Sequence, residues 1–159
     1  MEQLKYQIIS KSPQILIDLI ESSREAFMSL RAAADSCHDA NLKNFFTELA
    51  NERACFGFEL EGLSDRHNSA TFFNDEFLSA PVSRGRNHIQ YHQSSSSDQG
   101  LLEEYALAEA NALEQYRSAI AEPGLNYAKS ILQRHLDRVL RSRKEVQSWL
   151  GRSISERVH

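Results

Sequence analysis

Two stretches of the chain, 13–63 and 99–149, carry the same pattern of apolar residues at a separation of 86 positions, the shift that places Arg31 on Arg117. The shared pattern is the signal, because few residues are identical between the two stretches. Each stretch reads as two helices with a break between them, so the repeat predicts two helical hairpins that pack into a four-helix bundle. Apolar residues coincide at five pairs of positions: Leu16 and Leu102, Phe27 and Leu113, Leu30 and Tyr116, Phe46 and Leu132, and Leu60 and Val146.

The first stretch predicts a pair of antiparallel helices. Ser12 is a suitable N-cap and Pro13 suits the first helical position, so we expect the first helix to begin there. Asp35, Ser36 and Asp39 mark a short turn, after which the second helix runs back along the first. The inward residues at helical spacing are Leu16, Ile20, Ser23, Phe27, Leu30 and Ala34 on the first helix, and Leu42, Phe45, Phe46, Leu49, Phe56, Leu60 and Leu63 on the second.

The second stretch predicts a second pair of helices. Asp98 is a suitable N-cap, the sequence Glu-Pro-Gly at 122–124 breaks the helix, and Gly151 suits the C-cap of the last helix. We expect the polar residues 152–159 to fray. The inward residues are Leu102, Tyr105, Glu109, Leu113, Tyr116 and Ile120 on the third helix, and Ala128, Leu132, His135, Val139, Val146 and Leu150 on the fourth.

The order of these elements indicates a single domain, 1–159. Its parts are a hairpin at 13–63, a connection at 64–98, a hairpin at 99–150 and a polar tail at 151–159. Short turns within the hairpins and one long connection between them are typical of ferritin-like bundles. We therefore predict an all-α, ferritin-like four-helix bundle made of two antiparallel helical hairpins.

Four phenylalanines need a place in this fold: Phe58 on the second helix, and Phe72, Phe73 and Phe77 in the connection. In one interpretation the connection folds across the bundle and buries them, which offsets the entropy lost on ordering it. In the other they form the contact of a homodimer, because a large exposed apolar patch marks an interface. The sequence leaves both interpretations open.

Composition excludes several classes of function. The formal net charge of −4 gives no general attraction to nucleic acid or to anionic membranes. No apolar run approaches the roughly 20 residues that span a bilayer, and the first ten residues lack the zones of a signal peptide. The two cysteines, Cys37 and Cys55, do not suggest a disulfide framework. We expect a soluble protein of the reducing cytoplasm.

Glu109 is the residue whose position most suggests chemistry. Helical spacing places it at the centre of the inward face of the third helix. An unpaired carboxylate there would cost several kcal/mol, so it needs a metal ion, a cation or a proton. We expect a polar layer in the middle of the bundle, with His135 and Arg138 opposite Glu109 and with Ser23 and the pair at 52–53 at the same height.

The ligand count argues against a two-metal site. Such a site in a bundle of this type uses one inward Glu on each of two helices and Glu-x-x-His on each of the other two. The chain supplies Glu109, but the first helix has Ser23 and Phe27 on its inward face. Glu52 is followed three positions later by Cys55, and the fourth helix has arginines at the equivalent positions. Cations at these positions would oppose the binding of a divalent metal.

Two interpretations of the polar layer follow. In the first, it is a network without a cofactor, formed by Glu109, His135, Glu52, Arg53, Arg138 and Ser23. In the second, Glu109, His135 and Glu52 bind iron, manganese or zinc. We adopt the first, which lacks no ligand, and we predict no catalytic residue.

Other candidate sites have weaker patterns. His88 and His92 have the spacing of a helical zinc pair, but their segment has little helical pattern, so a solvated pair is the simpler interpretation. Cys55 lies off the inward face, and Cys37 sits at a turn, without a pattern that would activate either thiol. The cations from 134 to 144 read as a solvated face, with nucleic-acid binding as a minor alternative.

The chain resembles a bacterial ferritin-like family of unknown function, found among stress-associated four-helix-bundle proteins. The resemblance covers about 13–150 and is carried by LIDLIESSREAFMSLRAAAD, LKNFFTELANERACFGFELEGL, EYALAEANALEQYRSAI and the fourth helix. It implies an acid at Glu109, which is present. It also implies an inward Glu at the position of Phe27 and an acid and a His at those of Arg138 and Arg143, which are absent. The resemblance therefore implies the fold and a stress association, but no metal or substrate.

These observations lead to one expected function and one alternative. We expect a non-catalytic structural or interaction protein, linked to stress and forming a homodimer, with a degenerate metal site and no nucleic-acid or membrane partner. The alternative is a metal-binding bundle that uses Glu109, His135 and Glu52.

Overall fold

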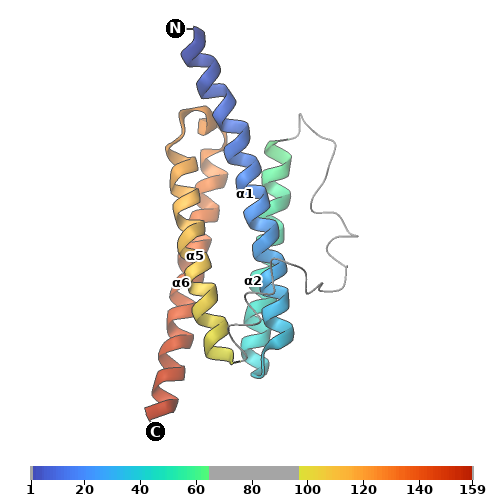
Figure 1. Ribbon diagram of the computed structural model, residues 1–159, viewed down its shortest axis with the longest axis vertical. Coiled ribbons are helices and arrows are strands. Elements are labelled where there is room, and N and C mark those ends of the chain that lie inside the picture. Colours follow the sequence, from blue (N-terminus) through green and yellow to red (C-terminus); the bar gives the residue numbers. More distant parts are fainter. Residues whose placement is uncertain (1, 65–96, 159) are drawn as a thin grey trace.

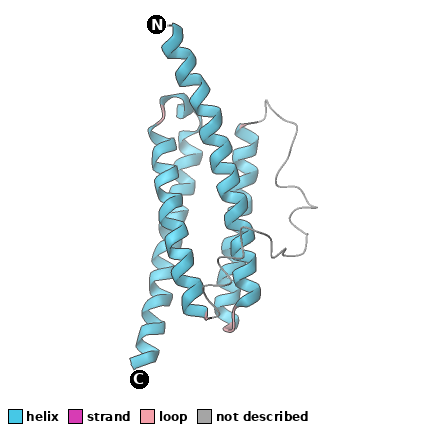
Figure 2. Ribbon diagram, in the orientation of Figure 1, coloured by secondary structure: helices cyan, strands magenta, loops and turns pink. Residues whose placement is uncertain are grey.

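The computed structural model describes residues 2–64 and 97–158, and the side chains of 12–64 and 97–152. Over these ranges the chain is helical and contains no strand (Figures 1 and 2). The elements are α1 (Glu2–Ser36), α2 (Ala40–Leu63), α5 (Asp98–Ala121), the short 3-10 helix η2 (Pro123–Ala128) and α6 (Lys129–Val158). The predicted all-α class and the helical bundle are confirmed.

The helices form two antiparallel hairpins that lie side by side. α1 packs against α2 and α5 against α6, and the hairpins meet through α1 with α5 and through α2 with α6. α2 ends at the end of the bundle where α1 enters, whereas α5 begins at the opposite end (Figure 1). Neighbouring helices from the two hairpins are therefore antiparallel as well.

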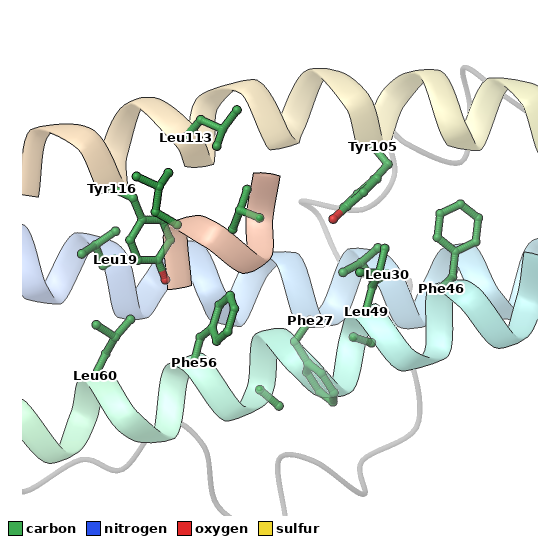
Figure 3. Close-up of a cluster of buried hydrophobic side chains, with 14 of the residues drawn as sticks. Leu19, Phe27, Leu30, Phe46, Leu49, Phe56, Leu60, Tyr105, Leu113 and Tyr116 are labelled. Carbon is green, nitrogen blue, oxygen red and sulfur yellow. The ribbon is translucent and has the colours of Figure 1, made fainter. Parts of the chain in front are cut away.

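The inward faces predicted from the repeat form the core. Every residue of the four predicted faces is buried, except Leu63, Ile120 and Leu150, which are partly buried against the core. Repeat-related residues such as Phe46 and Leu132 are both fully buried. Figure 3 shows the apolar side chains of α1, α2 and α5 meeting between the helices, with the two tyrosines of α5 pointing inward. The period of the sequence thus sets the phase of each helix.

The first helix begins earlier than predicted. α1 starts at Glu2, so Pro13 lies inside it and Ser12 is a buried helical residue rather than an N-cap. Proline removes one backbone donor, but its fixed φ is close to the helical value, so a helix of 35 residues continues across it. The first turns of α1 extend past the end of the other hairpin (Figure 1).

The ends of the second hairpin differ from prediction in two places. Ser97, not Asp98, caps α5, and its Oγ accepts a hydrogen bond from the backbone N of Gly100 at 3.0 Å. α6 runs through Gly151 to Val158, so the predicted stop and the frayed tail are wrong. Gly151 does not adopt the positive φ of a helix-ending glycine, and the helix is not interrupted there. The predicted break at 122–124 is confirmed, since α5 ends at Ala121.

Asp98 instead joins the two hairpins. Its carboxylate oxygens accept hydrogen bonds from the backbone N–H groups of His38 and Asp39, at 2.8 and 2.9 Å. Asp39 in turn caps α2 by accepting from the N–H groups of Asn41 and Leu42. The first turn of α5 is thereby fixed to the turn between α1 and α2.

Some predictions fall outside the described residues, namely those on Phe72, Phe73, Phe77, His88 and His92. Phe58 lies on α2 and is 42% exposed. None of the helices in the described part of the chain is long and apolar enough to cross a membrane.

Candidate functional site

A buried ion pair between α2 and α5 is the centre of the polar layer. Glu109 of α5 and Arg53 of α2 are only 2% and 4% exposed. Nη2 of Arg53 lies 3.0 Å from the hydroxyl of Tyr105 and 3.5 Å from Oε1 of Glu109. Tyr105 also hydrogen-bonds to the Glu109 carboxyl. The interior thus supplies Glu109 with the counter-charge that its position requires.

The network continues from this pair to the surface. Nη1 of Arg53 lies 3.2 Å from Oε1 of Glu52, and Oε2 of Glu52 lies 3.4 Å from Nη1 of Arg138. The Glu52 side chain is 22% exposed and that of Arg138 is 52% exposed. Charges alternate in sign along this line from Glu109 to Arg138, so each buried or half-buried charge has an opposite neighbour.

A second polar group surrounds His135 of α6, which is fully buried. The Tyr116 hydroxyl lies 3.1 Å from its Nδ1, and Oε1 of Glu59 lies 3.4 Å from its Nε2. Arg134 pairs with the other oxygen of Glu59, and Ser23 hydrogen-bonds to Tyr116. Because a carboxylate only accepts, Nε2 of His135 donates to Glu59, and Nδ1 accepts from Tyr116. Ser23 then donates to Tyr116, and every member of the group has a partner.

Phe56 lies between the two polar groups. The His135 ring stacks on the Phe56 ring at 4.0 Å between centroids and 14° between planes. The guanidinium carbon of Arg53 lies 5.1 Å from the same ring, and Tyr116 contacts it edge-on at 6.3 Å. An aromatic side chain at this position packs the apolar parts of both groups without adding a polar atom.

Burial changes the protonation of the central ion pair. Burial, opposed by the nearby Arg53 charge, raises the pKa of Glu109 to about 7. Burial works to lower the pKa of Arg53, but Tyr105, Glu109 and Glu52 around it raise the pKa above its ordinary value. Arg53 therefore stays charged, whereas Glu109 titrates close to neutral pH.

Burial keeps the second group neutral. It lowers the pKa of His135 to about 4, with the charges of Arg134 and Arg53 adding to the effect. Burial also raises the pKa values of Tyr105 and Tyr116. At neutral pH the imidazole is uncharged and both tyrosines hold their protons, as the hydrogen bonds above require.

The predicted metal ligands are not brought together. Glu109 and Glu52 lie on either side of the Arg53 guanidinium, and His135 belongs to the second group with Glu59. No cluster of three or more His, Cys, Asp or Glu side chains that could hold a metal ion occurs among the described residues. The guanidinium also opposes a divalent cation at this position. The residues present do not fit the metal centre of a ferritin-like bundle.

Sequence reasoning missed Glu59, Arg134 and the hydroxyls of the two tyrosines as members of the site. A signal for the first two exists, because Glu52 and Glu59 are seven positions apart and share one helical face. Arg134 and Arg138, four positions apart, share one face of α6, and this face meets the face of α2 that carries the two glutamates. The tyrosines carried no such signal, because an inward Tyr is equally consistent with packing.

The cysteines lie apart from the ion pair, whereas one further cation of α6 acts on it, because the charge of Arg143 works to lower the pKa of Glu109. Burial, with the charges of Asp98 and Asp39, raises the pKa of the Cys37 thiol to about 12, which makes it a poor nucleophile. Cys55 is exposed on α2. The cations at 141, 143 and 144 are exposed on α6.

The chain was compared with protein families, curated proteins and solved structures. A family described as a domain of unknown function (DUF2383) matches residues 12–122. No curated protein and no solved structure matches the chain.

Proposed function

This chain belongs to the DUF2383 family, whose function is unknown, and from that premise we propose that it is a ferritin-like bundle acting as a non-catalytic structural or interaction protein. In this proposal an internal guanidinium occupies the position at which related bundles hold metal ions. The protein then acts through its surface and its assembly, not through chemistry in its core.

The observation that carries this proposal is the environment of Arg53. Its guanidinium is buried between two carboxylates and a tyrosine hydroxyl, on helices from both hairpins. This supports the proposal, because the positive charge of the guanidinium opposes a divalent cation and already balances the carboxylates beside it. The site is also closed to a substrate, because Glu109, Arg53 and His135 are all buried.

Metal analysis tests the proposal directly. We expect the purified protein to contain no stoichiometric iron, manganese or zinc, and EDTA to leave its melting temperature unchanged. A chelator that lowered the melting temperature by several degrees would contradict the proposal, because metal binding to the folded state is linked to stability.

One observation favours the alternative of a metal-binding bundle. Oε2 of Glu109 is buried and has no hydrogen-bond partner in the structure, although a carboxylate oxygen in the interior normally has one. Reconstitution with Fe(II), Mn(II) or Zn(II), followed by desalting and elemental analysis, separates the two functions. Metal that is retained by the wild type and lost in Glu109→Gln would support the alternative.

Assembly and physiological role belong to the same proposal. We propose that the protein is a homodimer, which light scattering after gel filtration would measure. Exposed Phe58 on α2 is a first position to substitute.

The resemblance to stress-associated bundles extends the proposal to a role in stress. Cells that lack the gene should then survive heat, acid or oxidants less well than their parent, and equal survival would remove this part of the proposal.

A further inference from the structure

The outward face of α2 carries no charge over about four helical turns. The residues on this face are exposed and recur at helical spacing, and we call them the α2 stripe: Asn44, Thr47, Asn51, Cys55 and Phe58. In the described part of the chain, exposed charges recur along the other three long helices: Glu21 and Glu25 on α1, Glu103 and Glu114 on α5, and Arg141 and Lys144 on α6. The α2 stripe therefore differs from the outward faces of those helices.

The composition of the stripe is typical of a surface that contacts another protein. The core of an interface is depleted in charged residues and enriched in aromatic ones. Charged residues make up 25% of this chain, yet none lies on the stripe. The last residue of the stripe is Phe58, which is 42% exposed. The stripe thus has the composition of a helix face that packs against a partner.

The spacing of the stripe is the same in both directions from Asn51. Asn44 and Phe58 are each seven positions from it, and Thr47 and Cys55 are each four. Two antiparallel copies of α2 with a two-fold axis at Asn51 would therefore keep their stripes in contact along the whole length. Asn44 of one copy would face Phe58 of the other. The amide of Asn51 has both donors and an acceptor, so the two amides at the axis can hydrogen-bond to each other.

The charges beside the stripe favour the antiparallel arrangement. Lys43 and Glu61 are 18 positions apart, which is five helical turns, so both lie on the same side of the stripe at opposite ends. An antiparallel copy centred on Asn51 brings Lys43 to within two positions, about 3 Å along the helix, of Glu61 of the other copy. A parallel copy would instead bring Lys43 against Lys43 and Glu61 against Glu61, which like charges disfavour.

The other side of the stripe does not oppose this pairing with two unbalanced acids. Glu52 and Glu59 lie on that side, and they pair with Arg138 and Arg134 of α6 in the same chain. Their charges are therefore already balanced when a second copy approaches.

We propose that the α2 stripe is a docking surface for the α2 stripe of a second copy of this chain, in an antiparallel pair with Asn51 at the two-fold axis. The inference rests on the homodimer proposed above and names its surface and its orientation. A single pair of helices is a small contact, so the dimer is a weak one that a covalent trap detects best.

A cysteine at the axis tests the pairing in the full chain. N51C is made in a chain that also carries Cys37→Ser and Cys55→Ser, so that the new thiol is the only one. At the axis the two Cα atoms lie close enough for a disulfide. After mild oxidation with copper phenanthroline, we expect a covalent dimer at twice the chain mass of 18.1 kDa on a non-reducing gel. Circular dichroism checks that the variant is folded.

Two matched variants in the same background are the controls. N44C lies on the stripe, but in the antiparallel pair it is 14 positions, about 21 Å along the helix, from its own copy. N111C is exposed on α5 and lies outside the stripe. We expect about tenfold less covalent dimer from either control than from N51C. Equal cross-linking of N44C would overturn the antiparallel pair, and equal cross-linking of N111C would show that random collisions form the disulfide.

Light scattering of the wild type separates this inference from the homodimer itself. A wild-type dimer together with an N51C that does not cross-link would overturn the α2 stripe and leave the homodimer standing. A wild-type monomer and no cross-link would remove both. An N51C thiol that also resists alkylation by a maleimide would mean that another segment of the same chain covers the stripe, which equally overturns the docking surface.

Discussion

At the scale of single residues, the chain depends on a carboxylate that its own sequence places in an apolar face. Removing this carboxylate by Glu109→Ala leaves Arg53 buried beside Tyr105 and Glu52 without its innermost acid. We expect a loss of about 3–5 kcal/mol in the free energy of unfolding, measured with urea. Exposed Glu114→Ala on the same helix should change it by less than about 0.5 kcal/mol.

Removing the charge of Arg53 should destabilise the fold as removing the carboxylate of Glu109 does. Arg53→Met alone leaves Glu109 buried without a counter-charge, and we expect it to destabilise the fold by a similar amount, about 3–5 kcal/mol. The double variant with Glu109→Leu removes both charges and should recover much of the loss, because an apolar pair of similar volume replaces an ion pair well. Losses that simply add in a double-mutant cycle would show that the two residues are not coupled.

At the scale of elements, Asp98 determines how the start of α5 meets the turn between α1 and α2. Its carboxylate accepts two backbone hydrogen bonds from that turn, at 2.8 and 2.9 Å. We expect Asp98→Ala to destabilise the fold by about 1–3 kcal/mol, since two donors lose a charged acceptor. Asp35→Ala, at an exposed position near the end of α1, is the control and should have little effect.

The same aspartate has a second, independent readout. After burial, the charge of Asp98 is the next cause that raises the pKa of Cys37 to about 12. Asp98→Asn should lower this pKa, so alkylation of Cys37 at a fixed alkaline pH should become faster in a chain that carries Cys55→Ser. An unchanged rate in a folded variant would contradict the placement of this carboxylate beside the thiol.

At the scale of the whole molecule, two buried groups have opposite effects on stability between pH 4.5 and 6.5. Folding raises the pKa of Glu109 from 4.5 to about 7, so in this range the folded chain binds a proton that the unfolded chain has released. Folding lowers the pKa of His135 from 6.5 to about 4, so here the unfolded chain binds a proton that the folded chain lacks. The first effect makes stability fall as pH rises and the second makes it rise, and they nearly cancel.

Single substitutions should expose each effect. In Glu109→Gln only the histidine remains, and we expect stability to rise by up to about 1.4 kcal/mol per pH unit between pH 4.5 and 6.5. In His135→Gln only the carboxyl of Glu109 remains, so the slope should have the sign opposite to that of Glu109→Gln, with stability falling as pH rises. Urea denaturation of the three proteins at several pH values measures the slopes, and parallel curves would rule out both assignments.

The sequence predicts some features of the helices well and others poorly. The phase of each helix was predictable, because apolar spacing reports which side of a helix is buried, and Phe46, Leu60 and Glu109 lie where that spacing puts them. The ends of α1 and α6 were not, because Pro13 and Gly151 are compatible with a helix that continues past them.

By itself, the sequence determined two helical hairpins, their inward faces, and the need of Glu109 for a partner. Only the tertiary structure decided which partners meet: Arg53 with Glu109 and Tyr105, and His135 with Tyr116 and Glu59. The physical reason is that periodicity fixes the rotation of a helix about its own axis, whereas the offset and spacing between helices come from packing. Long polar side chains then reach whichever groups that packing brings within hydrogen-bond distance.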